Sequence, residues 1–271
     1  MNHPLLTATE IQWLLRQSLP EHGSAMFARD GGRRASFGRG LEPELLRRYQ
    51  YGDDVRRIDW AATLRLQRPM VRQTLPVAAG VLRIVVDASP SMATHTPSWH
   101  QLQRFVAAIG VVAMAAGDRV EAYVDPDEVA VFVDVSHWLR WCSTMTPHGM
   151  PWRLPALPAS PHPLVLCGDL LHSEWSQVLT QAHTCASQTV LCHWQIDDAA
   201  HLADDGEYEF IDSETAEKST VRVDATLRQR YQHARQTWYA EVQTTCRELG
   251  VRYIAVPPTT AIMTLMAEVV Q

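Results

Sequence analysis

Residues 81–92 of the chain are VLRIVVDASPSM, an apolar run that ends in an acid and two hydroxyl-bearing residues. Such a run, closed by the turn formers Asp, Ser and Pro, predicts a buried strand. Three further apolar runs, PLVLCGD, TVLCHW and VRYIAV, are separated by segments with helical periodicity. Strands that alternate with helices predict an α/β protein with a doubly wound, mostly parallel sheet that is covered on both faces.

Helices are expected between and after these strands. The spacing of apolar positions predicts helices at residues 7–19, 98–116, 225–249 and 259–270, and at SHWLRWCSTM and SEWSQVLTQAH. RVEAYV and VAVFVD flank the turn sequence at 125–128, which predicts a hairpin. The polar stretch at about 199–224 is expected to be a surface excursion with weak strands at EYEFID and TVRV. We therefore expect an N-terminal arginine-rich segment over 1–78 and an α/β domain over 79–271.

Composition narrows the class of protein. The 271 residues are 46% hydrophobic and 20% charged, which is ordinary for a globular chain. The sequence lacks an apolar run of about 18 residues and a secretory signal, so we expect a cytoplasmic protein without a membrane span. Its five cysteines include no CxxC pair and its twelve histidines no HExxH pair. Buried free thiols and structural histidines are therefore expected rather than a zinc or redox site.

Positive charge is concentrated in one part of the chain. Between Arg29 and Arg72 there are 11 Arg and 6 acidic residues, although the net charge of the whole chain is −6. The glycine-rich stretch 31–40 lacks the GK[ST] ending of a phosphate-binding loop, so a turn or flexible loop is expected there. Interleaved acids and the lack of an aromatic stacking pattern disfavour nucleic-acid binding. A salt-bridge network or a protein-binding face is the expected role.

The end of the first buried strand is the strongest candidate for a site. Asp87, Ser89 and Ser91 place three oxygen-bearing side chains where an α/β sheet commonly binds ligands. Magnesium prefers oxygen ligands and retains water in an octahedral shell. Asp169 ends another apolar run, and Thr146 lies on the loop before that run, so each could add a ligand. Asp, Ser and Pro also simply end strands, and Asp169 could cap the following helix, so this pattern leaves both interpretations open.

An enzyme is the main alternative at the same strand. A buried strand that ends in Asp resembles the start of haloacid dehalogenase-like phosphatases, in which Asp87 would be the nucleophile. That chemistry needs a second acid two residues later, where this chain has Ser89, and the only lysine, Lys218, lies in the polar excursion. The GxSxG elbow of serine hydrolases does not occur. We therefore expect no catalytic activity, with such a phosphatase, or a scaffold with a degenerate metal site, as alternatives.

A second unusual segment precedes the first strand. Residues 38–73, GRGLEPELLRRYQYGDDVRRIDWAATLRLQRPMVRQ, combine arginines, acids and aromatics, as a charge-paired clasp or a partner-binding surface would. Together with VLRIVVDASPSM, this segment closely resembles the bacterial domain of unknown function family fifty-eight. The family signature R-x-Y-x-x-G-D-D-x-R-x-I-D-W is carried here by Arg47 or Arg48, Tyr49, Gly52, Asp53, Asp54, Arg56, Ile58, Asp59 and Trp60.

The resemblance implies a Rossmann-like, von Willebrand factor A-like domain with a metal-ion-dependent adhesion site for Mg²⁺ or Mn²⁺. The residues that match the ligands of such a site are Asp87, Ser89, Ser91 and Asp169. The threonine expected after Gly149 is replaced by the sequence Met150-Pro151-Trp152. Thr146 is the candidate in its place.

The resemblance also implies partners. Members of this family are often encoded beside MoxR-type AAA+ ATPases and are thought to act as their substrate-binding or adaptor partners. We therefore expect a non-catalytic adaptor in protein complex assembly or maturation, with a bound cation that accepts an acidic side chain of a client protein or of the ATPase. The two N-terminal membrane spans of longer members are not found in this sequence, so the short soluble form is expected.

Overall fold

The structure is a computed structural model. It describes residues 4–17, 44–48, 60–74, 80–124, 128–147, 153–195, 204–213, 215–258 and 260–270. The chain divides into two compact units. The smaller unit is Arg29–Ala79, and the larger unit combines Met1–Ala28 with Gly80–Gln271.

A six-stranded sheet forms the centre of the larger unit. Its strands are β3 (Val81–Val86), β4 (Arg119–Tyr123), β5 (Ala130–Phe132), β6 (Leu164–Gly168), β7 (Thr189–Trp194) and β10 (Arg252–Val256). They lie in the order β10-β7-β6-β3-β4-β5, and every pair is parallel except β4 with β5. Every residue of β3, β6 and β7 is buried, because these strands have packing partners on both faces. The prediction of a mixed α/β protein with a mostly parallel sheet is confirmed.

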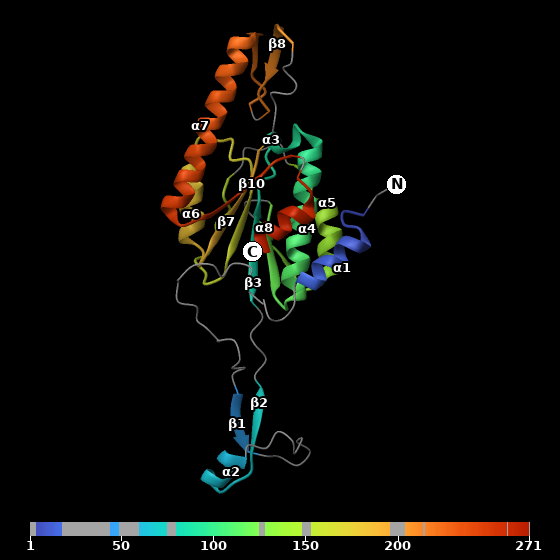
Figure 1. Cartoon of the computed structure of the whole chain (residues 1–271), viewed down its shortest axis with the longest axis vertical. Coiled ribbons are helices and arrows are strands. Elements are labelled where there is room, and N and C mark those ends of the chain that lie inside the picture. Colours follow the sequence, from blue (N-terminus) through green and yellow to red (C-terminus); the bar gives the residue numbers. More distant parts are fainter. Residues whose placement is uncertain are drawn as a thin grey trace. The chain divides into compact units, whose positions relative to one another are not determined.

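Helices cover both faces of this sheet (Figure 1). The helices α1 (Ala8–Gln17), α4 (Thr96–Ala115), α5 (Val135–Thr144) and α8 (Ile262–Val270) pack on one face, whereas α6 (Trp175–Thr184) and α7 (Ala225–Leu249) pack on the other. Side chains of β3 alternate between these two apolar layers: Ile84 and Val86 join the first, and Val85 joins the second. Within the described parts of the chain, no helix combines the length and the apolar character that crossing a bilayer requires.

Helix α1 belongs to the larger unit. Thr7 and Glu10 form a capping box, with Thr7 N–H donating to Glu10 Oε2 at 2.8 Å and Glu10 N–H donating to Thr7 Oγ1 at 3.2 Å. Leu6 and Leu14, 3% and 1% exposed, join the apolar layer that contains α4. The division therefore differs from the expected N-terminal segment 1–78, because burial of these two leucines attaches the first helix to the sheet domain.

In its described residues, 44–48 and 60–74, the smaller unit forms a short antiparallel pair of strands and one helix. Strand β1 (Glu44–Arg48) pairs with β2 (Met70–Thr74), and helix α2 (Trp60–Leu66) precedes β2. The Met70 N–H donates to Thr63 Oγ1 at 2.9 Å and joins the middle of α2 to the start of β2. Arg48 ends β1 and Trp60 begins α2, so the part of the family-like signature between them lies outside the described residues.

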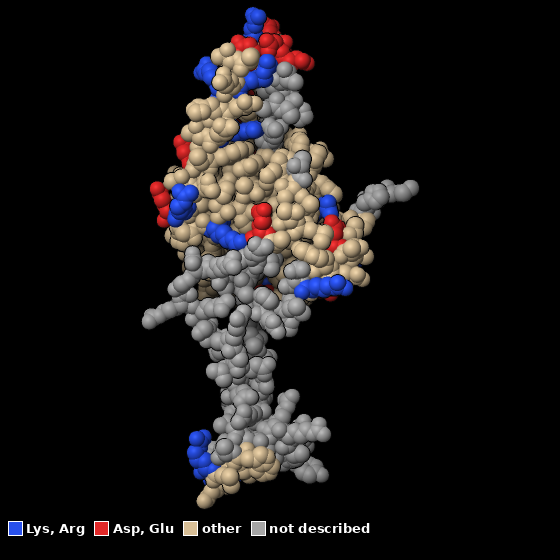
Figure 2. Space-filling view, in the orientation of Figure 1, with Lys and Arg blue, Asp and Glu red and all other residues tan. Residues whose placement is uncertain are grey.

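The region predicted as a polar excursion forms an antiparallel hairpin, and a long helix follows it. Strands β8 (Gly206–Ile211) and β9 (Lys218–Val223) pair directly, and α7 starts after Asp224, whose carboxylate caps the Leu227 N–H at 2.8 Å. Acidic and basic side chains gather over this hairpin and the first turns of α7 (Figure 2). Helix α7 ends at Gly250, whose φ of 74° is the left-handed conformation that favours glycine. Both predicted weak strands and the predicted limits of the long helix are confirmed.

The strand order marks where a ligand can approach the sheet. After β3 the chain adds β4 and β5 on one side and then crosses back to place β6 on the other side of β3. Adjacent parallel strands whose connections leave in opposite directions form a crevice beyond their carboxyl ends, which is where α/β sheets bind ligands. The ends of β3 and β6 are therefore the expected location of a site.

Candidate functional site

Asp87 continues the pairing of β3 with β6 by one residue. Its N–H donates to the Cys167 carbonyl at 2.8 Å, and its Oδ1 accepts the Ser89 N–H at 2.9 Å. Asp87 and Ser89 are 2% and 1% exposed, so the carboxylate is held in an almost closed environment. The short segment after β3 is therefore ordered by the acid itself.

The two hydroxyls of this segment lie together. Ser89 Oγ and Ser91 Oγ are 2.8 Å apart, and the one-turn helix α3 (Pro90–Ala93) starts between them. The Met92 N–H donates to the Ser89 carbonyl at 3.2 Å, and the fully buried Met92 side chain anchors the turn. Oxygen ligands at about 2.0–2.1 Å from Mg²⁺ in an octahedron lie roughly 2.9 Å apart at neighbouring corners. The 2.8 Å spacing is that of a hydrogen bond between the two hydroxyls, and it is also compatible with such a pair of corners.

Gly168 leaves the space that the Asp87 side chain occupies. A Cβ at Gly168 would lie 2.5 Å from Asp87 Cβ and 3.0 Å from Asp87 Oδ2, which is closer than any real contact of this kind. Asp87 therefore packs directly on the last residue of β6, and Asp169 is the next residue along the chain. The contact joins the ends of β3 and β6 as the strand order predicts.

Asp169 starts a strained turn. Its Oδ1 accepts the Leu171 N–H at 3.0 Å, and the His172 N–H donates to the Leu170 carbonyl at 2.8 Å. Leu170 has a φ of 56°, a left-handed conformation that is unfavourable for a residue with a branched apolar side chain, yet it is only 1% exposed. Surrounding contacts must hold this backbone in place, and strain of this kind is enriched at functional sites.

His193 supports that turn from the neighbouring strand. Its Nε2 is 2.9 Å from the Asp169 carbonyl, which can only accept, so Nε2 carries the proton and Nδ1 accepts from the Tyr253 hydroxyl at 3.1 Å. The same hydroxyl oxygen accepts the Gln195 Nε2–H at 3.2 Å. Burial lowers the pKa of His193 to about 4, so the ring is neutral at physiological pH. The hydrogen bonds therefore run in one direction, from Gln195 to Tyr253, from Tyr253 to His193 and from His193 to the Asp169 carbonyl.

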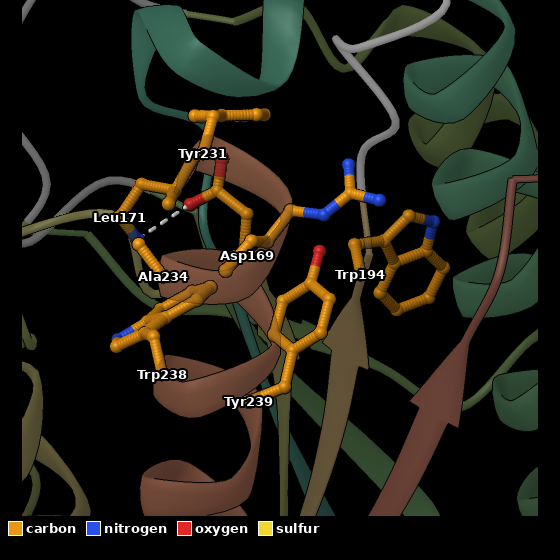
Figure 3. A pocket seen from close by; sticks show the side chains of 8 residues that line it. Asp169, Leu171, Trp194, Tyr231, Ala234, Trp238 and Tyr239 are labelled. Atoms are coloured by element: carbon orange, nitrogen blue, oxygen red, sulfur yellow. Dashed lines mark hydrogen bonds between the residues drawn. The ribbon is translucent and has the colours of Figure 1, made fainter. Parts of the chain in front are cut away.

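A pocket opens between this turn and α7 (Figure 3). Its volume is about 220 Å³, and the residues that line it are Asp169, Leu171, Trp194, Tyr231, Ala234, Arg235, Trp238 and Tyr239. The Trp238 and Tyr239 rings lie 5.1 and 5.3 Å from the His193 ring, which connects the pocket wall to the support of the Asp169 turn. None of the sequence motifs indicated this pocket. The spacing of Tyr231, Arg235, Trp238 and Tyr239 along one helical face was the pattern that could have indicated it.

The predicted metal ligands fall into two groups. Ser89 bonds to Asp87 through its N–H and to Ser91 through its hydroxyl, and Asp87 packs on Gly168, the residue before Asp169. Thr146 is exposed on the segment that follows α5, and the contacts of the described residues do not connect it to the other four. Its role as a ligand stays a prediction.

The signature residues of the smaller unit can be placed only in part. Trp60 is 66% exposed at the start of α2, and Arg48 ends β1. The other signature positions lie outside the described residues: Tyr49, Gly52, Asp53, Asp54, Arg56, Ile58 and Asp59.

The donor atoms at the end of β3 suit a hard cation. Among the described residues, no group of three or more His, Cys, Asp or Glu side chains is arranged to hold a metal. A cation held here would therefore need the serine hydroxyls as well as the carboxylates. Carboxylate and hydroxyl oxygens are ligands that Mg²⁺ and Mn²⁺ accept, with water in the remaining positions. The residues present fit such an ion.

The cysteines play a different part. All five are free thiols, and Cys142, Cys167, Cys192 and Cys246 are buried, as predicted. Burial raises the pKa of the Cys142 and Cys167 thiols, and raises that of Cys246 to about 12. These three thiols are therefore protonated and act as small apolar side chains of the core.

Part of the chain is similar to a known protein family. The profile of the family described as Protein of unknown function DUF58 matches residues 45–140, which confirms the predicted resemblance over that part. The chain is 38% identical over 90 residues to Uncharacterized protein Rv1480 of Mycobacterium tuberculosis (strain ATCC 25618 / H37Rv) and to Uncharacterized protein Mb1516 of Mycobacterium bovis (strain ATCC BAA-935 / AF2122/97). These matches cover 32% of this chain and 28% of the length of each relative.

Two solved structures are similar to the larger part of the chain. One is the conserved hypothetical protein BatB from Bacteroides thetaiotaomicron, with 11% identity and a TM-score of 0.42 over 70% of this chain and 96% of that chain. The other is an aerotolerance-related membrane protein from Bacteroides fragilis NCTC 9343, with 12% identity and a TM-score of 0.40 over 70% of this chain and 98% of that chain.

Proposed function

We propose that this chain is a non-catalytic binding module that holds Mg²⁺ or Mn²⁺ at the ends of β3 and β6 and offers it to an acidic group of a partner protein. Asp87, Ser89 and Ser91 would hold the ion, with Asp169 adding a ligand directly or through water. The observation that supports this proposal is the set of contacts at the end of β3. Asp87 orders the Ser89 backbone, and the two serine hydroxyls lie 2.8 Å apart.

The charge of this ligand set favours binding of a partner carboxylate. Asp87 is the only charged side chain among the three residues that follow β3, so these residues would leave one of the two positive charges of a divalent ion uncompensated, and Asp169 acting through water would leave the ion open to a further anion. A cation in that state attracts one further anionic oxygen, and a carboxylate of another protein supplies one. The bound ion would attract the partner's carboxylate, and the side chains at the end of β3 would hold the ion in place.

We also propose a more specific fold class for the sheet domain and a partner for the chain. We assign the sheet domain to the doubly wound, Rossmann-like class with a von Willebrand factor A-like site. The ends of β3 and β6 lie at the reversal of strand order, which supports this assignment. The partner that the family resemblance suggests is a MoxR-type AAA+ ATPase together with a client protein, and we propose an adaptor role between them in complex assembly.

Cation binding can be tested by thermal unfolding. Addition of Mg²⁺ or Mn²⁺ at about one hundred times its Kd is expected to stabilise the protein by about 2.7 kcal/mol. For a chain of this size that corresponds to roughly 5–10 °C in Tm. Asp87→Asn keeps an oxygen that can accept the Ser89 N–H but removes the charge, so its cation-dependent shift is expected to disappear.

A matched control distinguishes the loss of a cation ligand at Asp87 from the general effect of removing a hydrogen-bonded carboxylate. Asp134 caps α5 by accepting the His137 N–H at 2.9 Å, and Asp134→Asn changes charge in the same way away from the strand ends. This control is expected to keep the full cation response. A wild-type protein that does not respond, or an Asp87→Asn variant that responds as strongly as wild type, contradicts the site.

The non-catalytic part of the proposal has its own test. Turnover of a generic phosphate ester by the wild-type protein, lost in Asp87→Asn, would contradict it in favour of a phosphatase. Binding to a purified MoxR-type ATPase, compared between wild type and Asp87→Asn in Mg²⁺, tests the partner. Equal binding by both proteins would leave the cation without a role in that contact.

A further inference from the structure

The pocket between α7 and the Asp169 turn is suited to one side chain of a partner. Its volume of about 220 Å³ lies below the range of about 300–1,000 Å³ that small-molecule and cofactor sites occupy. A nucleotide or a flavin is therefore too large for it, whereas one aromatic or large aliphatic side chain has a suitable size. Figure 3 shows the aromatic side chains of α7 and the Trp194 ring around the same space as Asp169.

The residues around the pocket are of the types that carry binding energy in protein interfaces. Trp, Tyr and Arg are enriched among such residues, and four of the lining side chains on α7 are of these types. The Arg235 guanidinium carbon lies 5.9 Å from the ring centroids of both Tyr231 and Tyr239, which holds the cation between two aromatic faces. Leu171 and Tyr231, 49% and 39% exposed, place apolar surface at the rim.

The wall of the pocket is already ordered. Trp238 and Tyr239 pack edge-on against the buried His193 ring, and His193 donates to the Asp169 carbonyl. The pocket wall and the turn that carries the candidate ligand are thus supported by the same buried ring. A preformed pocket avoids the cost of ordering side chains when a partner binds.

We infer that this pocket receives an aromatic or large aliphatic side chain of the partner, next to the acidic residue that the cation at Asp87 would bind. The inference rests on the proposed function, because Asp169 is both a candidate ligand and part of the pocket wall. A single extended segment could place the acid at the end of β3 and the neighbouring bulky residue in the pocket. Arg235 and Asp169 both line the pocket, so their opposite charges offset one another and the pocket itself favours an uncharged side chain.

A filled-pocket variant tests this inference without removing any core residue. Ala234 is exposed on α7 and lines the pocket, so Ala234→Leu fills the space while leucine remains a good helix former. The matched control is Ala240→Leu, a change of the same size at an exposed position of α7 that does not line the pocket. Equal melting temperatures for these two variants and wild type establish that the fold is intact.

The probe is a phage-displayed library of random 12-residue peptides, selected on the full-length protein in Mg²⁺. The expected result is enrichment of peptides in which Asp or Glu stands within two residues of Trp, Phe, Tyr, Leu or Met. Affinity of a selected synthetic peptide is expected to fall roughly tenfold or more in Ala234→Leu, as for loss of an interface anchor, and less than about twofold in Ala240→Leu. Enrichment of no bulky apolar residue, or unchanged affinity in Ala234→Leu, overturns the inference.

Failure of the inference and failure of the proposed function give different results. If Asp87→Asn loses binding and Ala234→Leu keeps it, the cation site stands and the pocket has no part in recognition. If Ala234→Leu loses binding and Asp87→Asn keeps it, the pocket recognises the bulky residue and the cation site is wrong. Self-association of the wild-type protein that Ala234→Leu abolishes, measured by analytical ultracentrifugation, would identify a second copy as the occupant and overturn the assignment to a different protein.

Discussion

Replacing Gly168 by alanine is expected to destabilise the protein through one contact. The new Cβ would lie 2.5 Å from Asp87 Cβ, whereas carbon atoms pack at about 3.5–4.0 Å. The neighbouring atom is the Cβ of Asp87 rather than a flexible side-chain end, and pairing between β3 and β6 fixes both backbones. Either the strands separate or Asp87 leaves its position.

The sign of the effect follows from the size of the competing contributions. Gly168 is not among the glycines with positive φ, so alanine is compatible with its backbone. At such positions, the lower entropy of the unfolded chain would stabilise the protein by about 0.4–1 kcal/mol. Overpacking of a closed site costs about 1–3 kcal/mol, and loss of the Asp87 bond to the Ser89 N–H costs about 1.5–3 kcal/mol more. We expect a net destabilisation of about 1.5–5.5 kcal/mol.

Chemical and thermal unfolding measure this difference. For a chain of this size the expected loss corresponds to a decrease in Tm of roughly 3–22 °C. Gly206→Ala is the matched control, because its new Cβ would have a single neighbour at 3.7 Å, an ordinary contact with the Tyr208 ring. The control is expected to change the free energy of unfolding by less than about 0.5 kcal/mol.

The same variant also tests the link between packing and the site. Because Asp87 would be displaced, Gly168→Ala is expected to lose the cation-dependent rise in Tm along with part of its stability. A Gly168→Ala protein as stable as wild type would refute the close contact between β3 and β6. It would show that the Asp87 side chain does not lie on Gly168.

Two further predictions concern buried polar groups. Burial lowers the pKa of His193 to about 4, below the value of 6.5 for an exposed histidine, so the unfolded chain binds the proton more tightly. The stability that depends on the neutral ring is therefore complete above about pH 6.5 and is lost as pH falls toward 4. In urea unfolding, the free energy of unfolding of wild type should fall by about 2–3 kcal/mol more than that of His193→Gln between pH 7 and 4.5. An equal loss in both proteins would contradict the neutral buried ring. Arg83 is 1% exposed and its guanidinium donates to the carbonyls of Pro158, His162 and Cys185, so Arg83→Met should destabilise by about 2–5 kcal/mol. In the same assay Arg119→Met, which removes an exposed partner of Glu121, should cost less than about 1 kcal/mol, and equal costs for the two variants would show that burial of Arg83 has no effect.

Much of the fold could be predicted because its causes are local. The apolar runs at β3, β6 and β7 are buried strands in a mostly parallel sheet, as their composition indicated. The limits of α7 agree with the prediction because Asp224 caps the first turn and Gly250 takes a left-handed conformation at the end. Each of these causes acts within a few residues, so the sequence displays it directly.

The candidate site could be predicted only in part. Asp87, Ser89 and Ser91 are close in sequence, and their contacts follow from one turn after a strand. The side chains around the pocket come from α7, β7 and the Asp169 turn, and no local pattern states that these elements meet. The part played by His193 was also missed, because a histidine in an apolar run predicts only a buried ring and not its partners.

The amino-acid sequence by itself determined which segments become strands and helices, where they end, and which oxygen-bearing side chains follow β3. Propensity, capping and apolar spacing are properties of neighbouring residues, so they need no knowledge of the rest of the chain. Only the tertiary structure decided that Leu6 and Leu14 join the sheet domain, that β6 lies beside β3, and that Asp87 packs on Gly168. Those contacts depend on strand order and on the burial of apolar surface between distant segments, which alternation of strands and helices along the chain does not specify.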